Sequence, residues 1–301
     1  MAIVILNSKP NKSKKKYVRI KPVNNPKTIE NEARRLLKRM TEPMKADINV
    51  ILEQMQADQN LKAAEVGRRL ENIRKTYEEM FALNADQIAK NWVGRVNSNN
   101  RKKMIAEMRE KLGIDVGTIL DEEMAKDLEV MMLEASTYIK TIPTELVFKV
   151  ADRVLQHYKG VPFPENRTLR QQIKEEFKVS DGRAKVLARD QTAKMNTSIS
   201  AIRQKAIGID MYIWRTVQDE RVVGKPGGRY PKGTKLHKNH YIMEGKCCRW
   251  DNPDVYSEDN GKTWKNRTEQ MPHNHPGDDI MCRCRPEALI DVEALKVKWA
   301  E

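Results

Sequence analysis

The sequence has 301 residues, a formal net charge of +14, 39% hydrophobic and 33% charged side chains, and four cysteines. Its length allows two domains, whereas a mean hydropathy of −0.72 leaves little apolar material for large cores. No stretch approaches the roughly 20 apolar residues of a membrane-spanning helix, and the run from Ala2 to Leu6 lacks the features of a signal peptide. We therefore expect neither a membrane protein nor a secreted one, and cysteines that act as free thiols or metal ligands in a reducing compartment.

Residues 1–27 are expected to form a basic N-terminal arm. Residues 1–25 contain seven basic side chains and no acidic one, and Lys14, Lys15 and Lys16 follow one another directly. The segment begins with a short β-prone run and is otherwise poor in apolar residues, so we expect it to become ordered only on a partner. It either contacts DNA, adds a strand to a partner, or remains a solvated tail.

Residues 28–205 are expected to be mainly helical. Apolar residues recur at steps of three and four from Ile29 to Met55, which predicts a long amphipathic helix that Pro43 bends or begins. The same pattern predicts helices at roughly 61–92, 100–111 and 121–139.

Three breaks are expected within this helical region. The run Asn97–Asn100 and the stretch from Gly113 to Gly117 have the composition of turns, and Gly160–Pro164 interrupts the helical pattern. Beyond it the apolar spacing resumes, and Ser180 is expected to cap the helix that carries Arg183 to Asn196.

Residues 206–301 are expected to form a small domain rich in strands and loops. Near Ile209 the period changes from helical to alternating, which predicts a strand with Tyr212 and Trp214 on one side and Ile213 on the other. Clusters of glycine and proline follow. The fold class is therefore α+β, with an N-terminal extended helical region followed by a strand-and-loop-rich C-terminal domain.

A second basic segment lies in this domain. Residues 221–250 contain eight basic side chains against the single acidic Glu244, and such local patches are typical of contact with nucleic acid or another anionic partner. The alternative is a solvated loop. Together with the three lysines of the arm, the residues expected to make these contacts are Arg221, Lys225, Arg229, Lys232, Lys235 and Lys238.

The C-terminal domain also holds all four cysteines and four of the five histidines. Cys282 and Cys284 are two residues apart, so on an extended chain their thiolates share one side and can bind one metal ion. The best further ligands are His240 and one of the adjacent Cys247 and Cys248, with His273 and His275 in reserve. We expect a structural zinc ion, because a metal can replace a core that is too small.

Other interpretations of these residues stay open. The spacing matches no standard zinc finger, so the residues can equally serve without a metal, or hold a catalytic metal with an open position. The consecutive string His273-Asn274-His275 carries no information about an HNH nuclease, whose residues are dispersed. A nuclease would instead use a histidine base beside carboxylates, for which Asp219, Glu220 and His240 are the candidates.

Over roughly residues 165–290 the order of features resembles the phage Mu F-like head morphogenesis family, which comprises minor capsid proteins of tailed phages. The resemblance depends on the helix Ala184–Asn196, on Tyr212-x-Trp214 with Asp219-x-Arg221, on His240 followed by Gly245, on Trp250-Asp251-x-Pro253, and on His275-Pro276-Gly277 leading to Cys282-Arg283-Cys284. One departure is a Gly/Pro/Lys-rich insertion at 222–239, which leaves open whether His237 or His240 takes the family's histidine position.

The resemblance implies a structural virion protein present in few copies, to which no catalytic residue is assigned. Its expected partners are the portal protein or the major capsid protein and the packaged double-stranded DNA, with several copies around a ring. Its expected location is the head interior or the portal vertex, after assembly in the host cytoplasm. The alternatives are a metal-dependent nuclease or toxin-like domain, and a host zinc protein that binds nucleic acid.

Overall fold

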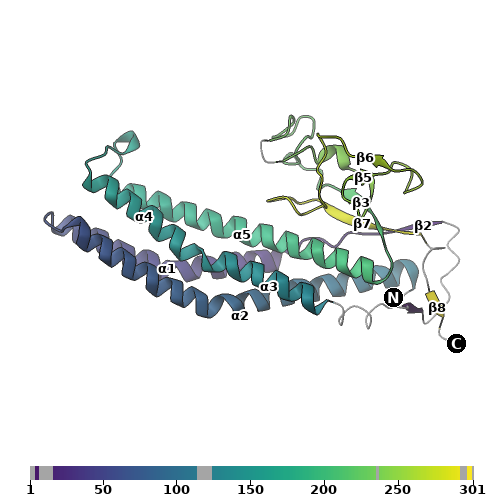
Figure 1. Ribbon diagram of the computed structural model, residues 1–301, viewed down its shortest axis with the longest axis horizontal. Helices are drawn as coiled ribbons and strands as arrows, with labels where there is room; N and C mark the ends of the chain where they lie inside the picture. The colour runs from purple at the N-terminus through teal and green to yellow at the C-terminus, as the bar shows by residue number, and fades with distance from the viewer. Residues whose placement is uncertain (1–3, 7–15, 114–123, 235–236, 292–296, 300–301) are drawn as a thin grey trace. The chain divides into compact units, whose positions relative to one another are not determined.

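The computed structural model describes residues 4–6, 16–113, 124–234, 237–291 and 297–299. The expected α+β class is confirmed: long helices come first and a small sheet with loops follows (Figure 1). The chain divides into two compact units. One contains residues 27–93 and 129–191, and the other contains 1–26, 94–128 and 192–301, so the helical region contributes to both.

The first unit is a bundle of antiparallel helices. It contains α1 (Lys27–Ala57), the first part of α2 (Ala63–Leu112), α3 (Ala125–Lys140), α4 (Ile142–Tyr158) and the first part of α5 (Leu169–Ala206), with the short η1 (Pro164–Asn166) before α5. The apolar stripe of α1 is buried, as its spacing predicts, and Pro43 lies inside the helix. None of the helices in the described part of the chain has the length and apolar composition needed to cross a membrane.

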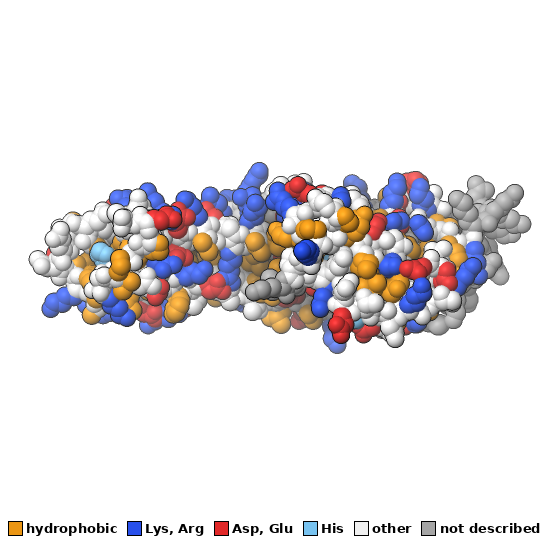
Figure 2. All heavy atoms as spheres, turned by 90° about the horizontal axis from the view of Figure 1, so that it is seen from above, with side chains coloured by type: hydrophobic (Ala, Val, Ile, Leu, Met, Phe, Trp, Pro, Cys, Tyr) orange, Lys and Arg blue, Asp and Glu red, His pale blue; other side chains and the backbone are white. Residues whose placement is uncertain are grey.

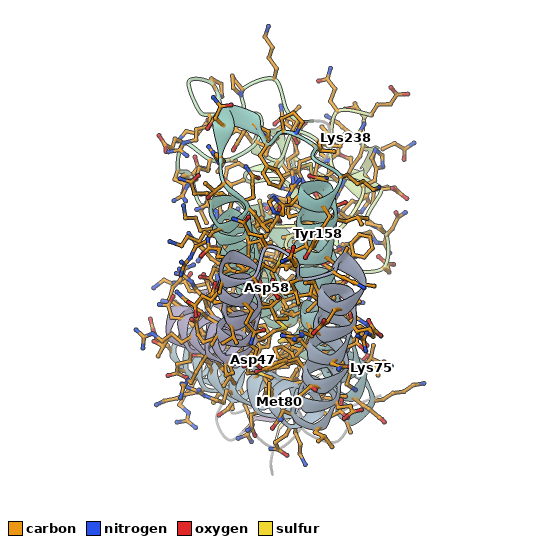
Figure 3. All side chains as sticks on the ribbon, turned by 90° about the vertical axis from the view of Figure 1, so that its left-hand side faces the viewer. Asp47, Asp58, Lys75, Met80, Tyr158 and Lys238 are labelled. Carbon is orange, nitrogen blue, oxygen red and sulfur yellow. The ribbon has the colours of Figure 1, made fainter. Side chains whose placement is uncertain are left out.

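Polar contacts join four helices of this bundle to one another. Tyr77 of α2 donates to Asp47 of α1 (2.7 Å), and Arg153 of α4 donates to Glu176 of α5 (2.9 Å). At the end of the bundle seen in Figure 3, the Tyr158 hydroxyl donates to the Leu61 carbonyl oxygen. Thr144 of α4 also donates to Glu78 of α2. The helices α1, α2, α4 and α5 therefore meet in that order, and Lys45, only 8% exposed, closes the ring by binding Asp181 of α5.

The second unit contains the sheet. Its four strands are β2 (Tyr17–Ile20), β7 (Arg285–Asp291), β3 (Met211–Arg215) and β4 (Cys247–Arg249), antiparallel and in that order. The remaining elements are the parallel pair β1 (Val4–Leu6) and β8 (Val297–Trp299), the antiparallel pair β5 (Val255–Tyr256) and β6 (Lys265–Asn266), and η2 (Tyr241–Met243). Tyr17–Ile20 belongs to the predicted arm, so this part of the arm has its partner within the chain.

Both faces of the sheet are covered, which follows from the alternation along β3. Tyr212 and Trp214 lie in a cluster with Cys282 and Cys284, whereas Ile213 packs with Cys247 and Leu289 on the other face. The ends of α2 and α5 bury a third cluster against β2 and β7 through residues such as Met104, Met108, Ile207, Ala288 and Ile290.

Two predicted helix boundaries are wrong. The turn expected at Asn97–Asn100 is a continuous part of α2, because Asn100 is fully buried and donates to Asn196 and Ser200 of α5. Arg203 in turn donates to both Asn97 and Asn100. Ser180 is no helix cap but an interior residue of α5, which runs unbroken from Leu169 to Ala206.

Gly277 fixes the loop that leads to the cysteines. Its φ of +94° is favourable only for glycine, and an added Cβ would lie 2.5 Å from the Thr197 hydroxyl oxygen. Gly208 has a similar φ of +77° but open space around it. Substitutions at the two glycines therefore separate the free-energy cost of backbone strain from the cost of steric overlap.

We predict that Gly208→Ala lowers the free energy of unfolding by about 1 kcal/mol through strain alone. Gly277→Ala should lower it by about 3 kcal/mol, because Thr197 must also move. Urea unfolding of both variants and the unchanged protein measures the difference. Equal losses would show that the loop is not packed against α5 as described.

Candidate metal centre

Three of the five predicted metal ligands meet in the second unit. The Nδ1 atom of His240 lies 3.5 Å from the sulfur of Cys282 and 3.5 Å from that of Cys284. All three donor atoms lie within 4.8 Å of one another, and the residues are 5%, 8% and 5% exposed. We call this group the His-Cys-Cys cluster.

The cysteines are positioned by the turn before β7. The Cys282 amide donates to the Asp279 carbonyl oxygen (3.0 Å), which closes the turn, and the two cysteines then point to one side while Arg283 points to the other. Arg283 donates two hydrogen bonds to the carboxylate of Asp219. Asp219 therefore holds the outer side of the Cys-x-Cys segment, and this contact with Arg283 lowers the pKa of its carboxyl to about 2.

Asp279 sets the orientation of the His240 ring. Its Oδ2 lies 2.7 Å from His240 Nε2, and its Oδ1 accepts from the Asn274 amide. A carboxylate at Nε2 places the ring proton there, which leaves the Nδ1 lone pair directed at the two sulfurs. Carboxylate–histidine pairs of this kind support metal-binding histidines in many proteins.

The distances within the cluster favour a shared cation over hydrogen bonds. A ring nitrogen makes one good hydrogen bond here, either by accepting from one thiol or, when protonated, by donating to one thiolate. Zinc lies about 2.05 Å from nitrogen and about 2.3 Å from sulfur, and at tetrahedral angles these donors are about 3.5 Å apart. Both nitrogen–sulfur distances match this separation. The cluster can therefore hold one metal ion.

The electrostatics of the cluster agree with this chemistry. Burial alone would lower the pKa of His240, but the bonds with Asp279 and Cys282 raise it to about 9. Contacts with Cys284 and His240 hold the pKa of Cys282 well below its ordinary value, whereas the Cys282 sulfur and burial raise that of Cys284. Negative charge therefore collects at Cys282, and a bound cation would displace the remaining protons.

Trp214 supplies an independent indication. Its side chain is fully buried, its ring centroid lies 5.8 Å from that of His240, and its Nε1 atom has no hydrogen-bond partner in the described part of the chain. A buried N–H without an acceptor is costly, and a metal-bound thiolate accepts more strongly than a thiol does.

The other two predicted ligands lie elsewhere. Cys247 and Cys248 point to opposite faces of β4, and neither belongs to the cluster. The sulfur of Cys248 accepts from Arg267 (3.3 Å), while burial raises the pKa of Cys247 to about 12. Asp279 and Trp214 were not expected from the sequence, although the place of Asp279 three residues before Cys282 was an available signal.

The reserve histidines also have other partners. His273 is exposed and binds Asp254 (2.8 Å), and His275 contacts the Tyr212 hydroxyl through Nδ1 (2.9 Å). Burial lowers the pKa of His275 to about 4. Its ring is therefore neutral at pH 7.

Several predicted contact residues of the basic loop bind other groups within the chain. Arg221 lies 3.5 Å from Asp219, Arg229 binds Glu220 (2.7 Å), and Lys225 donates to the Gln218 carbonyl oxygen. Lys238 is exposed (Figure 3), as are Lys16 and Lys232. Lys14, Lys15 and Lys235 lie outside the described residues. On the face shown in Figure 2, basic side chains are scattered among acidic and hydrophobic ones.

We predict that His275 makes the domain less stable in acid. Its folded pKa lies below the ordinary value, so the unfolded chain binds a proton first, and stability is lost as the pH falls from about 6.5 to 4. His275→Gln should make the unfolding free energy about 2 kcal/mol less sensitive to pH over this range. Unfolding of both proteins at several pH values and the same free zinc concentration measures this difference. Parallel profiles of unfolding free energy against pH would contradict the prediction.

Comparison with known proteins gives one distant relative to report. An uncharacterized protein of Haemophilus influenzae is 26% identical over 281 residues, which cover 91% of this chain and 56% of the relative. The chain thus spans a little over half the length of that relative. No family model matches the chain, and no solved structure matches it. The likeness takes in most of both the helical region and the C-terminal domain.

Proposed function

We propose that the chain is a minor head protein of a tailed bacteriophage, a structural component that associates with the portal or the inner head surface and with DNA. The observation that carries the proposal is the burial of the His-Cys-Cys cluster, whose members are 5–8% exposed. The three donors leave a fourth tetrahedral position to water or another group, but their burial keeps substrate away from that position, which suits a domain-stabilising role.

The proposed metal is zinc. Two thiolates and a neutral imidazole are ligands that zinc prefers, and their separations fit its bond lengths. The zinc would join the turn before β7 to His240, which directly precedes η2. The strands around these two segments are short, and the buried cluster beside them contains few aliphatic residues. Its binding free energy would then contribute to the stability of this domain.

The shared motif residues also support a structural role. Asp219 binds Arg283, and His240 binds Asp279 and the cysteines. The acid and base that a nuclease would need are therefore engaged with different partners within the chain. The resemblance to the Mu F-like family implies that these positions belong to a head protein, and the exposed Lys16, Lys232 and Lys238 suit contact with DNA or an acidic partner.

We predict that Cys282→Ala and Cys284→Ala lower the affinity for zinc by about 100-fold or more, because each removes a ligand. Cys247→Ala is the matched control, since Cys247 is as buried but lies outside the cluster. Competition with a chromophoric chelator measures the affinity.

If the cysteine variants fail to fold, the melting temperature of the unchanged protein provides a second test. Chelation should lower it, and added zinc should restore it. Zinc bound equally by all four proteins would exclude the cluster as the metal centre.

We predict that nuclease-treated phage particles contain this chain in a few copies per head, measured by quantitative mass spectrometry against the major capsid protein. Absence from the particle would favour a transient assembly factor or the nuclease alternative. Incubating plasmid DNA with the protein and Mg²⁺, Mn²⁺ or Zn²⁺ tests the latter directly. Cleavage that His240→Ala abolishes would contradict the structural role.

A further inference from the structure

His240 has a second set of possible metal ligands on its other side. His237, His240 and Asp279 each offer a donor atom, and these three atoms lie within 4.8 Å of one another. The Asp279 oxygen lies 2.7 Å from Nε2, while both sulfurs face Nδ1. The two donor sets therefore use opposite nitrogens of one imidazole ring.

The outer set is open to solvent where the inner one is buried. The side chain of Asp279 is 23% exposed and that of His240 6%, and His237 is half-buried. The His237 and His240 rings are nearly perpendicular, with centroids 6.2 Å apart. Because the donor atoms already lie within 4.8 Å of one another, small side-chain movements would bring them to one ion, whose remaining positions water would take.

We propose that His240 is shared by two cations, with an outer divalent transition metal ion bound by Nε2 of His240, His237 and Asp279. The proposal rests on the inner zinc proposed above. Imidazole and carboxylate donors suit Zn²⁺, Cu²⁺ or Ni²⁺, whereas Mg²⁺ and Ca²⁺ prefer oxygen alone.

Binding of the outer ion requires the shared His240 ring to lose the proton on Nε2. When the outer ion binds, the Nε2–H bond breaks and the proton leaves to solvent, so the ring becomes an imidazolate with one nitrogen on each metal. A divalent ion with the imidazolate and the Asp279 carboxylate has no net charge. The Oδ2–Nε2 distance must open from 2.7 Å to about 3.3 Å, which two donors about 2 Å from one ion require.

The outer ion would fasten a loop that the inner ion does not reach. His237 lies near the end of the Gly/Pro/Lys-rich insertion at 222–239, and its own amide donates only locally, to the Thr234 hydroxyl. Asp279 lies in the turn that positions Cys282. Occupation of the outer position therefore ties the basic insertion to the metal-bearing turn.

Ion counting tests the proposal on the full chain. After removal of metal with a chelator, the protein is equilibrated with buffered Zn²⁺, and bound zinc per chain is measured by mass spectrometry of the metal. We expect two ions for the unchanged protein and one for His237→Ala. His273→Ala is the matched control, because His273 also pairs with an aspartate, Asp254, but has no second histidine, and it should keep two.

A spectroscopic measurement identifies the outer ligands. Cu²⁺ added to protein holding one zinc should show electron paramagnetic resonance couplings from two ring nitrogens, reduced to one in His237→Ala. One ion in both proteins, with no change on His237→Ala, would overturn the outer site and leave the inner zinc standing. If the Cys282→Ala and Cys284→Ala variants bind as many ions as the unchanged protein, the inner zinc fails instead.

Discussion

The hydrogen bond between Asp279 and His240 is the constraint on which the metal centre depends. It decides which ring nitrogen carries the proton, and so whether the other can serve as a ligand to a cation beside Cys282 and Cys284. The turn that carries Asp279 also closes on Cys282 through its backbone. One short segment therefore provides the two sulfurs and the carboxylate that aims the third donor.

The sequence could predict the class of fold and the core of the site, but not its boundaries. The helical and alternating periods of the chain identified α1 and β3, and the spacing of Cys282 and Cys284 identified the pair of sulfurs. The choice between His237 and His240, and the exclusion of Cys247 and Cys248, depends on backbone turns between residues 216 and 284. Residue spacing contains no information about those turns.

The wrong helix boundary at Asn97–Asn100 has a physical cause. Asparagine and serine favour turns when their side chains bond to the local backbone. Here Asn100, Asn196 and Ser200 bond to one another across two helices instead. The local preference is then overridden by partners about 100 residues away, which a reading of neighbouring residues could not identify.

The same polar contacts determine how α2 and α5 are aligned. Two helices that met only through apolar side chains could slide past each other by one turn, about 5.4 Å, because each apolar contact would be replaced by a similar one. Such a slip would carry the fully buried Arg203 away from the oxygens of Asn97 and Asn100, and an unsatisfied buried charge costs several kcal/mol. The pair of helices therefore has a single favoured alignment, and a longer or shorter helix could replace either one only if it preserved the phase of these polar side chains.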